Sequence, residues 1–244
     1  GDTLAASSEV IGLRENSNHR TGVVWVRSTG RNQRGEVVLD YCRWVMVRKR
    51  DEEAPAPEAV APELAGAVAP AGFRAPPGLD FTRYDFALAG EPPRWGDYAI
   101  GERIDHVDRV TLDEAEHMLA TRLWQNTSKV HFDVTARPDG RRLIYGGHVI
   151  SMARALSFNG LANAQVVVAI NGGAHVNPAF AGDTISAWSE VLDVADTNIP
   201  GAGALRLRLA AIQAGQHGFT LHGSDGKYLP HVLLDFDYWV LIPK

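Results

Sequence analysis

Two histidines, His117 and His131, lie between the carboxylates Glu116 and Asp133, a combination suited to general acid–base chemistry. An imidazole exchanges protons near neutral pH, so His131 is a candidate general base. The sequence does not decide which carboxylate would act together with His131. Asp133 lies two residues further on, where an extended chain would point both side chains to the same side, and Glu116 lies on a predicted helix before it. Either carboxylate can instead be a solvated surface charge, and His117 is expected to be structural or exposed.

Gly146 and Gly147 come directly before an apolar stretch that predicts a helix. The first amides of a helix have no partner inside it and lie at the positive end of its dipole, so they suit a developing oxyanion. The backbone amides of Gly147 and His148 are therefore candidates for an oxyanion site. The alternative is a steric role, in which the glycines only permit close packing.

Two helices are expected in the second part of the chain. A capping-box pattern at 111–114 predicts a helix that runs to about Trp124 and packs through Leu112, Ala115, Leu119 and Leu123. A short extended piece follows around 130–134. The apolar run 148–158 predicts a helix enclosed on most sides, and Asn159-Gly160 supplies a left-handed stop.

Strand patterns account for most of the remaining sequence. Leu205, Leu207 and Leu209 alternate with arginines, which indicates a sheet with one face in water. An enclosed helix followed by a long antiparallel meander predicts an α+β fold in which the sheet wraps around the helix, the hotdog fold. The strands are predicted at 3–13, 22–28, 36–48, 102–110, 164–170, 184–194, 204–212 and 231–242.

An internal repeat sets the domain organisation. GDTLAASSEV at 1–10 returns as GDTISAWSEV at 182–191 with seven of ten positions identical, and VVLDYCRWVMVRK at 37–49 matches VLLDFDYWVLIPK at 232–244. The first copy lacks a counterpart of the sequence between about 95 and 181. We therefore expect a double hotdog whose first hotdog is present only as its C-terminal strands at 1–50, then a Pro/Ala-rich linker at 51–79 and a complete hotdog at 80–244.

The composition excludes several functional classes. A net charge of −5 gives no general attraction for nucleic acid. Cys42 is the only cysteine, so no disulfide forms within the chain, and no signal peptide or membrane-length apolar run is present. We expect a cytoplasmic protein without nucleic-acid or membrane partners.

Long strings of the sequence resemble the MaoC-like hydratases with a double-hotdog chain, and among them the mesaconyl-CoA hydratases, also called β-methylmalyl-CoA dehydratases. The resemblance covers residues 1–50 and about 80–244. The strings that carry it are NQRGEVVLDYCRWVMVRKRD, IDHVDRVTLDEAEHMLATRLWQNTSKVHFD, YGGHVISMARALSFNGLANA and NPAFAGDTISAWSE.

The resemblance implies a lyase that reversibly adds water to mesaconyl-CoA, giving β-methylmalyl-CoA, in the ethylmalonyl-CoA pathway. It implies no metal and no redox cofactor, with CoA as part of the substrate, and a homo-oligomer is expected. Two alternatives are an acyl-CoA thioesterase on the same fold and a noncatalytic acyl-CoA-binding or assembly subunit, because one fold carries several chemistries.

The family motif D-x-N-P-x-H matches NTSKVH at 126–131 in this chain. His131 is in place, whereas Asn126 stands where the family has Asp. Asn126 can orient water or the imidazole but cannot exchange a proton. Hydration of an unsaturated thioester needs a base, an acid and donors to the thioester oxygen, so Asp133 or Glu116 would have to compensate.

Cations are expected to hold the charged parts of such a substrate. A desolvated carboxylate requires a paired cation, and Arg122 and Arg154 are the candidates. Arg154 lies on an otherwise apolar helix, where it can also snorkel to solvent. Lys129, Arg141 and Arg142 can meet CoA phosphates or simply form a charged hairpin.

Overall fold

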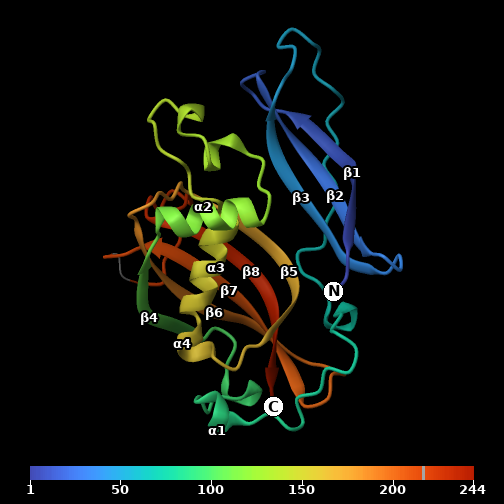
Figure 1. The fold of residues 1–244 in the computed structure, drawn as a ribbon, viewed down its shortest axis with the longest axis vertical. Coiled ribbons are helices and arrows are strands. Elements are labelled where there is room, and N and C mark those ends of the chain that lie inside the picture. The colour runs from blue at the N-terminus through green and yellow to red at the C-terminus, as the bar shows by residue number, and fades with distance from the viewer. Residues whose placement is uncertain (216–217) are drawn as a thin grey trace. The chain divides into compact units, whose positions relative to one another are not determined.

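The computed structural model describes residues 1–215 and 218–244, which form two compact units, Gly1–Ala65 and Gly66–Lys244. The first unit is a three-stranded antiparallel sheet of β1 (Leu4–Glu15), β2 (Thr21–Asn32) and β3 (Val37–Arg48), in that order (Figure 1). Part of the predicted linker belongs to this unit, because Leu13 and Val60 exchange backbone hydrogen bonds of 2.8 and 2.9 Å.

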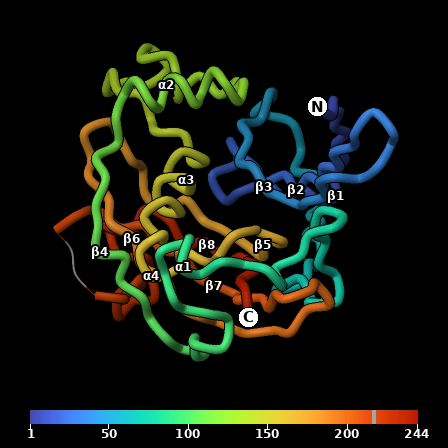
Figure 2. The backbone as a smooth tube through the Cα atoms, turned by 60° about the horizontal axis from the view of Figure 1, so that its bottom comes forward, coloured from blue at the N-terminus to red at the C-terminus, as the bar shows by residue number. Residues whose placement is uncertain are grey.

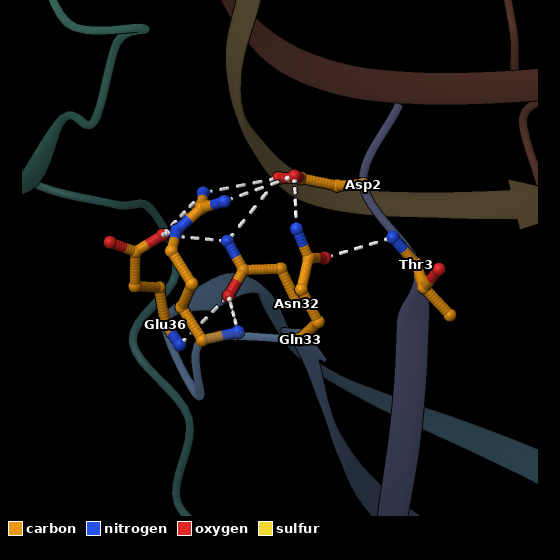
Figure 3. Close-up of polar contacts among 6 residues, drawn as sticks. Asp2, Thr3, Asn32, Gln33 and Glu36 are labelled. Atoms are coloured by element: carbon orange, nitrogen blue, oxygen red, sulfur yellow. Dashed lines mark hydrogen bonds and ion pairs between the residues drawn. The ribbon is translucent and has the colours of Figure 1, made fainter.

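The turn between β2 and β3 is fastened by side chains (Figure 3). The Asn32 carboxamide oxygen accepts the amides of Arg34 and Glu36 at 3.0 and 3.1 Å, and the Arg34 guanidinium pairs with both Asp2 and Glu36. Gly35 has a φ of +80°, a conformation that glycine adopts without strain. The β2–β3 turn is therefore held by its own hydrogen bonds and by Asp2, which lies just before β1.

The second unit contains a five-stranded antiparallel sheet in the order β4-β6-β7-β8-β5. Leu205, Leu207 and Leu209 are fully buried, while Arg206 pairs with Asp237 on the opposite face, so the predicted alternation is confirmed. The strands are β4 (Arg103–Thr111), β5 (Val166–His175), β6 (Thr184–Asp196), β7 (Ala202–Gln213) and β8 (Val232–Pro243).

The repeated sequences occupy equivalent strands in the two units. The first matched pair leads into β1 and β6, and the second lies on β3 and β8. Both units place their three shared strands in the same order, β1-β2-β3 and β6-β7-β8. Only the second unit adds β4 and β5 at the two edges. Apolar side chains of β3 such as Trp44 and Met46 are accordingly 57% and 64% exposed.

Helix α3 (Gly146–Leu156) lies along the concave face of the second sheet (Figures 1 and 2). Its Val149, Ala153 and Leu156 join one buried cluster with Leu207 of β7 and Tyr238 of β8. Gly160 follows in the left-handed region, with a φ of +89°, as the predicted stop requires. A helix enclosed by an antiparallel sheet is the predicted hotdog arrangement.

Helix α2 (Glu114–Leu123) crosses over the beginning of α3 (Figures 1 and 2) and differs from the prediction in two ways. Asp113 is its N-cap, accepting the amides of Ala115 and Glu116, whereas Thr111 belongs to β4. The predicted packing face is also wrong beyond Leu112. Leu119 and Leu123 are 68% and 67% exposed, and the helix buries His117 and Thr121 because both form hydrogen bonds in the interior.

The extended piece predicted around 130–134 is also wrong. The chain forms two short 3₁₀ turns there, η3 (Lys129–His131) and η4 (Val134–Ala136). The Phe132 amide donates to the Lys129 carbonyl in the first, and the Ala136 amide donates to the Asp133 carbonyl in the second. Short helical segments complete the fold: η1 (Pro70–Gly72), α1 (Phe86–Ala89), η2 (Trp95–Asp97) and α4 (Phe158–Leu161).

Candidate active site

His131 lies at the end of η3 and is held by the segment that leads into α3. Its Nδ1 is 2.9 Å from the Leu143 carbonyl oxygen, and the Leu143 amide donates back to Val130 at 2.9 Å. A carbonyl oxygen can only accept, so a neutral His131 carries its proton on Nδ1 and presents a bare lone pair at Nε2. Such a nitrogen can take a proton from water.

His117 on α2 is the second imidazole of the site and is fully buried. Its Nε2 accepts the Tyr145 backbone amide at 2.9 Å and lies 3.2 Å from the Thr121 hydroxyl. Burial, reinforced by the neighbouring His148 and His131, lowers the pKa of His117 to about 4, so the ring is neutral at physiological pH. The prediction of a structural or exposed residue did not anticipate this placement next to His131.

Two further histidines and a tyrosine complete the cluster. The ring centroid of His117 lies 6.4 Å from that of His131 and 6.1 Å from that of His148, and the Tyr145 ring lies 6.0 Å from His131. His175 reaches the same place from β5. Burial lowers the pKa values of His148 and His175. The histidine cluster is thus formed by His117, His131, His148 and His175, which come from α2, η3, α3 and β5.

Sequence reasoning missed His175, Tyr145 and the side chain of His148. The glycine pair was the available signal. A Cβ at Gly146 would lie 2.3 Å from His175 Nε2, and one at Gly147 would lie 2.1 Å from the Tyr145 hydroxyl oxygen. A side chain at either position would therefore displace one of these rings, in agreement with the steric alternative.

The backbone amides at the start of α3 differ in availability. The His148 amide donates to the Tyr145 carbonyl at 2.9 Å and is not free to bind an oxyanion. The Gly147 amide forms no hydrogen bond within the part of the chain that the structure describes. Of the two predicted donors, Gly147 is the one left for a ligand.

The three other polar residues predicted around His131 form no hydrogen bond or ion pair with it. The Asn126 carboxamide oxygen accepts the Ser128 amide at 2.9 Å and closes its own loop. Asp133 accepts the amide and hydroxyl of Thr135 at 2.9 and 2.6 Å, which holds its pKa below the usual range. Its expected alignment with His131 along a strand is wrong because η3 and η4 replace the strand. Glu116 is exposed on α2. Its charge partly opposes the lowering of the His148 pKa that burial causes.

Two named proteins resemble the chain along its whole length. No protein-family model matches it. It is 70% identical over all 244 residues to the mesaconyl-CoA hydratase of Cereibacter sphaeroides and covers 71% of that protein. It is 55% identical over 251 aligned positions to the β-methylmalyl-CoA dehydratase of Chloroflexus aurantiacus and covers 71% of that protein as well. The chain belongs to the mesaconyl-CoA hydratase family.

Solved structures agree with this membership. A putative MaoC domain protein dehydratase from Chloroflexus aurantiacus superposes with a TM-score of 0.95 at 53% identity, covering all of this chain and 71% of that one. A conserved hypothetical protein from Mycobacterium tuberculosis, described as a double hotdog, gives a TM-score of 0.68 at 25% identity, covering 99% of this chain and 70% of that one. These structures show that the chain has the double-hotdog fold. The two named relatives show that it is a hydro-lyase of this family.

The cations predicted for this member of the mesaconyl-CoA hydratase family fall into two groups. Three are engaged within the chain. Arg154 donates to the Ser157 hydroxyl and the Ala164 carbonyl, Arg142 pairs with Glu114, and Arg141 lies 3.8 Å from the Phe180 ring centroid.

Arg122 and Lys129 are exposed and form no ion pair among the described residues. Arg122 lines a hollow of about 400 Å³, together with Met118, Thr121, Gln125, Asn126, Thr127 and Phe132. This α2 hollow adjoins the histidine cluster through Thr121, whose hydroxyl faces His117.

Two general properties complete the description of this family member. In residues 1–215 and 218–244 no helix is long and apolar enough to cross a membrane. Within the same residues no group of three or more His, Cys, Asp or Glu side chains is arranged to hold a metal ion.

Proposed function

We propose that this protein catalyses the reversible addition of water to the double bond of mesaconyl-CoA, giving β-methylmalyl-CoA. The observation that carries the proposal is the 70% identity along the whole chain to a mesaconyl-CoA hydratase. The 55% identity to a β-methylmalyl-CoA dehydratase supports it, because the two names describe one reaction in opposite directions.

In this proposal His131 is the base. Its Nε2 lone pair removes a proton from water while the water oxygen bonds to the β-carbon, and the electrons of the double bond move toward the thioester oxygen. The imidazolium then delivers the proton to the α-carbon, so the net change is the addition of one water. His131 is suited to this role because the Leu143 carbonyl holds its other nitrogen protonated.

The Gly147 amide is our candidate for the oxyanion donor. It lies at the N-terminal end of α3, where the helix dipole favours developing negative charge. Arg122 and Lys129 are the candidates for the charged groups of the substrate. Among the described residues Arg142 is taken up by an ion pair, Arg154 by hydrogen bonds and Arg141 by an aromatic ring, whereas the side chains of Arg122 and Lys129 have no such contact. Asn126, Asp133 and Glu116 would act only through loop structure or charge.

Several broader features belong to the same proposal. The reaction is redox-neutral and consists of proton transfers around one C–O bond, so it includes no cofactor beyond the CoA of the substrate. We place the protein in the cytoplasm as a homo-oligomer, with Cys42 exposed and reduced. We assign residues 80–244 to a complete hotdog and residues 1–50 to the last strands of another, joined by 51–79. The equivalence of β1-β2-β3 with β6-β7-β8 supports that assignment.

The experiment is turnover of mesaconyl-CoA followed by mass spectrometry, with the wild-type full-length polypeptide and its His131→Ala variant. We expect the wild type to add one water and the variant to lose this activity by at least about 100-fold. Release of free CoA instead would indicate a thioesterase. Binding without any product would indicate the noncatalytic alternative. In that case Asn126 would serve only to close its own loop.

A further inference from the structure

Two imidazole nitrogens in the histidine cluster are buried without a partner. His117 Nδ1 and His148 Nε2 are both inaccessible to solvent, and neither forms a hydrogen bond within the described part of the chain. The two rings are neighbours, with centroids 6.1 Å apart and planes tilted by 49°. Buried polar groups of folded proteins are nearly always satisfied, so two unsatisfied nitrogens on neighbouring rings indicate a place for a polar ligand atom.

The proton on His117 can be located from its surroundings. The Tyr145 backbone amide can only donate, so the Nε2 atom that meets it at 2.9 Å must be the bare nitrogen. Burial and the nearby His148, His131 and Arg142 disfavour the charged ring. A neutral His117 with a bare Nε2 carries its hydrogen on Nδ1, and the nitrogen without a partner is therefore a hydrogen-bond donor.

This donor is tied to the beginning of α3. The Tyr145 amide that fixes the ring lies two residues before the Gly147 amide, which forms no hydrogen bond among the described residues. The Thr121 hydroxyl lies 3.2 Å from the same Nε2, and Thr121 lines the α2 hollow together with Arg122 and Asn126. The contacts of this one nitrogen therefore connect His117 both to the start of α3 and to a residue of the hollow.

We propose that His117 binds substrate directly, donating from Nδ1 to an oxygen of an α,β-unsaturated acyl-CoA beside the neighbouring His148 ring. The proposal rests on the proposed function and adds a second donor to the Gly147 amide. The oxygen is either the thioester carbonyl or a free carboxylate of the acyl group, both of which accept such a bond. A neutral imidazole held in one tautomer can stabilise developing negative charge without taking up a proton itself.

Two substitutions separate this role from a structural one. In His117→Gln the side-chain amide reaches the Nε2 position, where its oxygen can still accept the Tyr145 amide, but the Nδ1 donor is lost. In His117→Asn the amide lies at the Nδ1 position and can still donate, but the Tyr145 bond is lost. The matched control is His106→Gln, at a buried histidine whose two nitrogens already bond Asn159 and Ser189.

The first measurement is steady-state turnover of mesaconyl-CoA and of crotonyl-CoA, which lacks the free carboxylate, together with Tm, on full-length polypeptides. We expect His117→Gln to keep a Tm near that of wild type and to lose at least about 100-fold in kcat. His117→Asn should lower Tm and recover part of kcat, while His106→Gln lowers Tm with kcat unchanged. His117→Gln activity within about threefold of wild type would overturn the proposal.

The two substrates identify the oxygen. An equal loss on both assigns the bond to the thioester carbonyl, whereas a loss confined to mesaconyl-CoA assigns it to the carboxylate. A wild type that hydrates neither substrate refutes the proposed function, but it does not decide the role of His117.

A second measurement covers that case and any variant that fails to fold. It uses ¹⁵N-labelled wild-type protein and saturated methylsuccinyl-CoA, which has no double bond to hydrate. We expect a protonated Nδ1 resonance of His117 that shifts on binding. An unprotonated Nδ1, or a resonance that methylsuccinyl-CoA at saturation leaves unmoved, would overturn the proposal.

Discussion

His106 makes the stability of the second unit sensitive to mild acid. The side chain is fully buried, with Nδ1 2.7 Å from the Asn159 carbonyl oxygen and Nε2 2.8 Å from the Ser189 hydroxyl. Burial lowers its pKa from 6.5 to about 4. The unfolded chain therefore binds a proton at this site before the folded protein does as the pH falls.

The sign and size of the effect follow from these two pKa values. The contribution of the neutral ring is fully present above pH 6.5 and is lost as the pH falls toward about 4. Linkage gives a loss of about 2 kcal/mol in the free energy of unfolding between pH 7 and pH 5 from this side chain alone. His117, whose pKa is lowered to a similar value, acts in the same direction.

The assay is urea unfolding followed by tryptophan fluorescence at pH 7 and pH 5, for wild type and His106→Gln. The constant cost of the substitution cancels when each protein is compared with itself at the two pH values. We expect the wild type to lose about 2 kcal/mol more than the variant. The exposed His222→Gln serves as the control and should lose as much as wild type. Equal losses in wild type and His106→Gln would refute the reasoning.

Three further substitutions test other parts of the structure. Gly160→Ala places a side chain at a φ of +89° with its Cβ 2.6 Å from Ile104, so we expect the urea midpoint to fall by the equivalent of about 1–3 kcal/mol. Asp113→Ala removes the cap of α2 and should cost about 1 kcal/mol by the same assay; no change would mean that another group caps the helix. Arg122→Gln should raise the KM for mesaconyl-CoA at least about tenfold and leave that for crotonyl-CoA near wild type, and equal changes would assign Arg122 to the CoA portion.

The sheet could be predicted from the sequence because its signals are local and repeated. The alternation around Leu205–Leu209 and the matched repeats at 1–10 and 182–191 are each visible without tertiary information. The enclosed helix was predictable for the same reason, since its apolar residues surround the axis and Gly160 marks its end.

The site was less accessible to prediction because its contacts join distant residues. His117 looks like a surface residue on a helix with a leucine face, and only the Tyr145 amide, 28 positions later, explains its burial. The His131 tautomer depends on Leu143, and the role of Gly146 depends on a ring from β5. The expected alignment of Asp133 with His131 was wrong for the opposite reason. A purely local hydrogen bond from the Thr135 amide holds the Asp133 carboxylate.

Helix α2 carries a consequence for how the interior of the second unit is reached. Its buried face consists of His117 and Thr121, while Leu119 and Leu123 face outward, so detaching this helix exposes little apolar surface. Segments held by few apolar contacts open locally at a fraction of the global unfolding free energy. The amides of α2 should therefore exchange with deuterium earlier than those of α3, and a ligand can meet His117 through brief excursions of α2 without loosening the sheet beneath it.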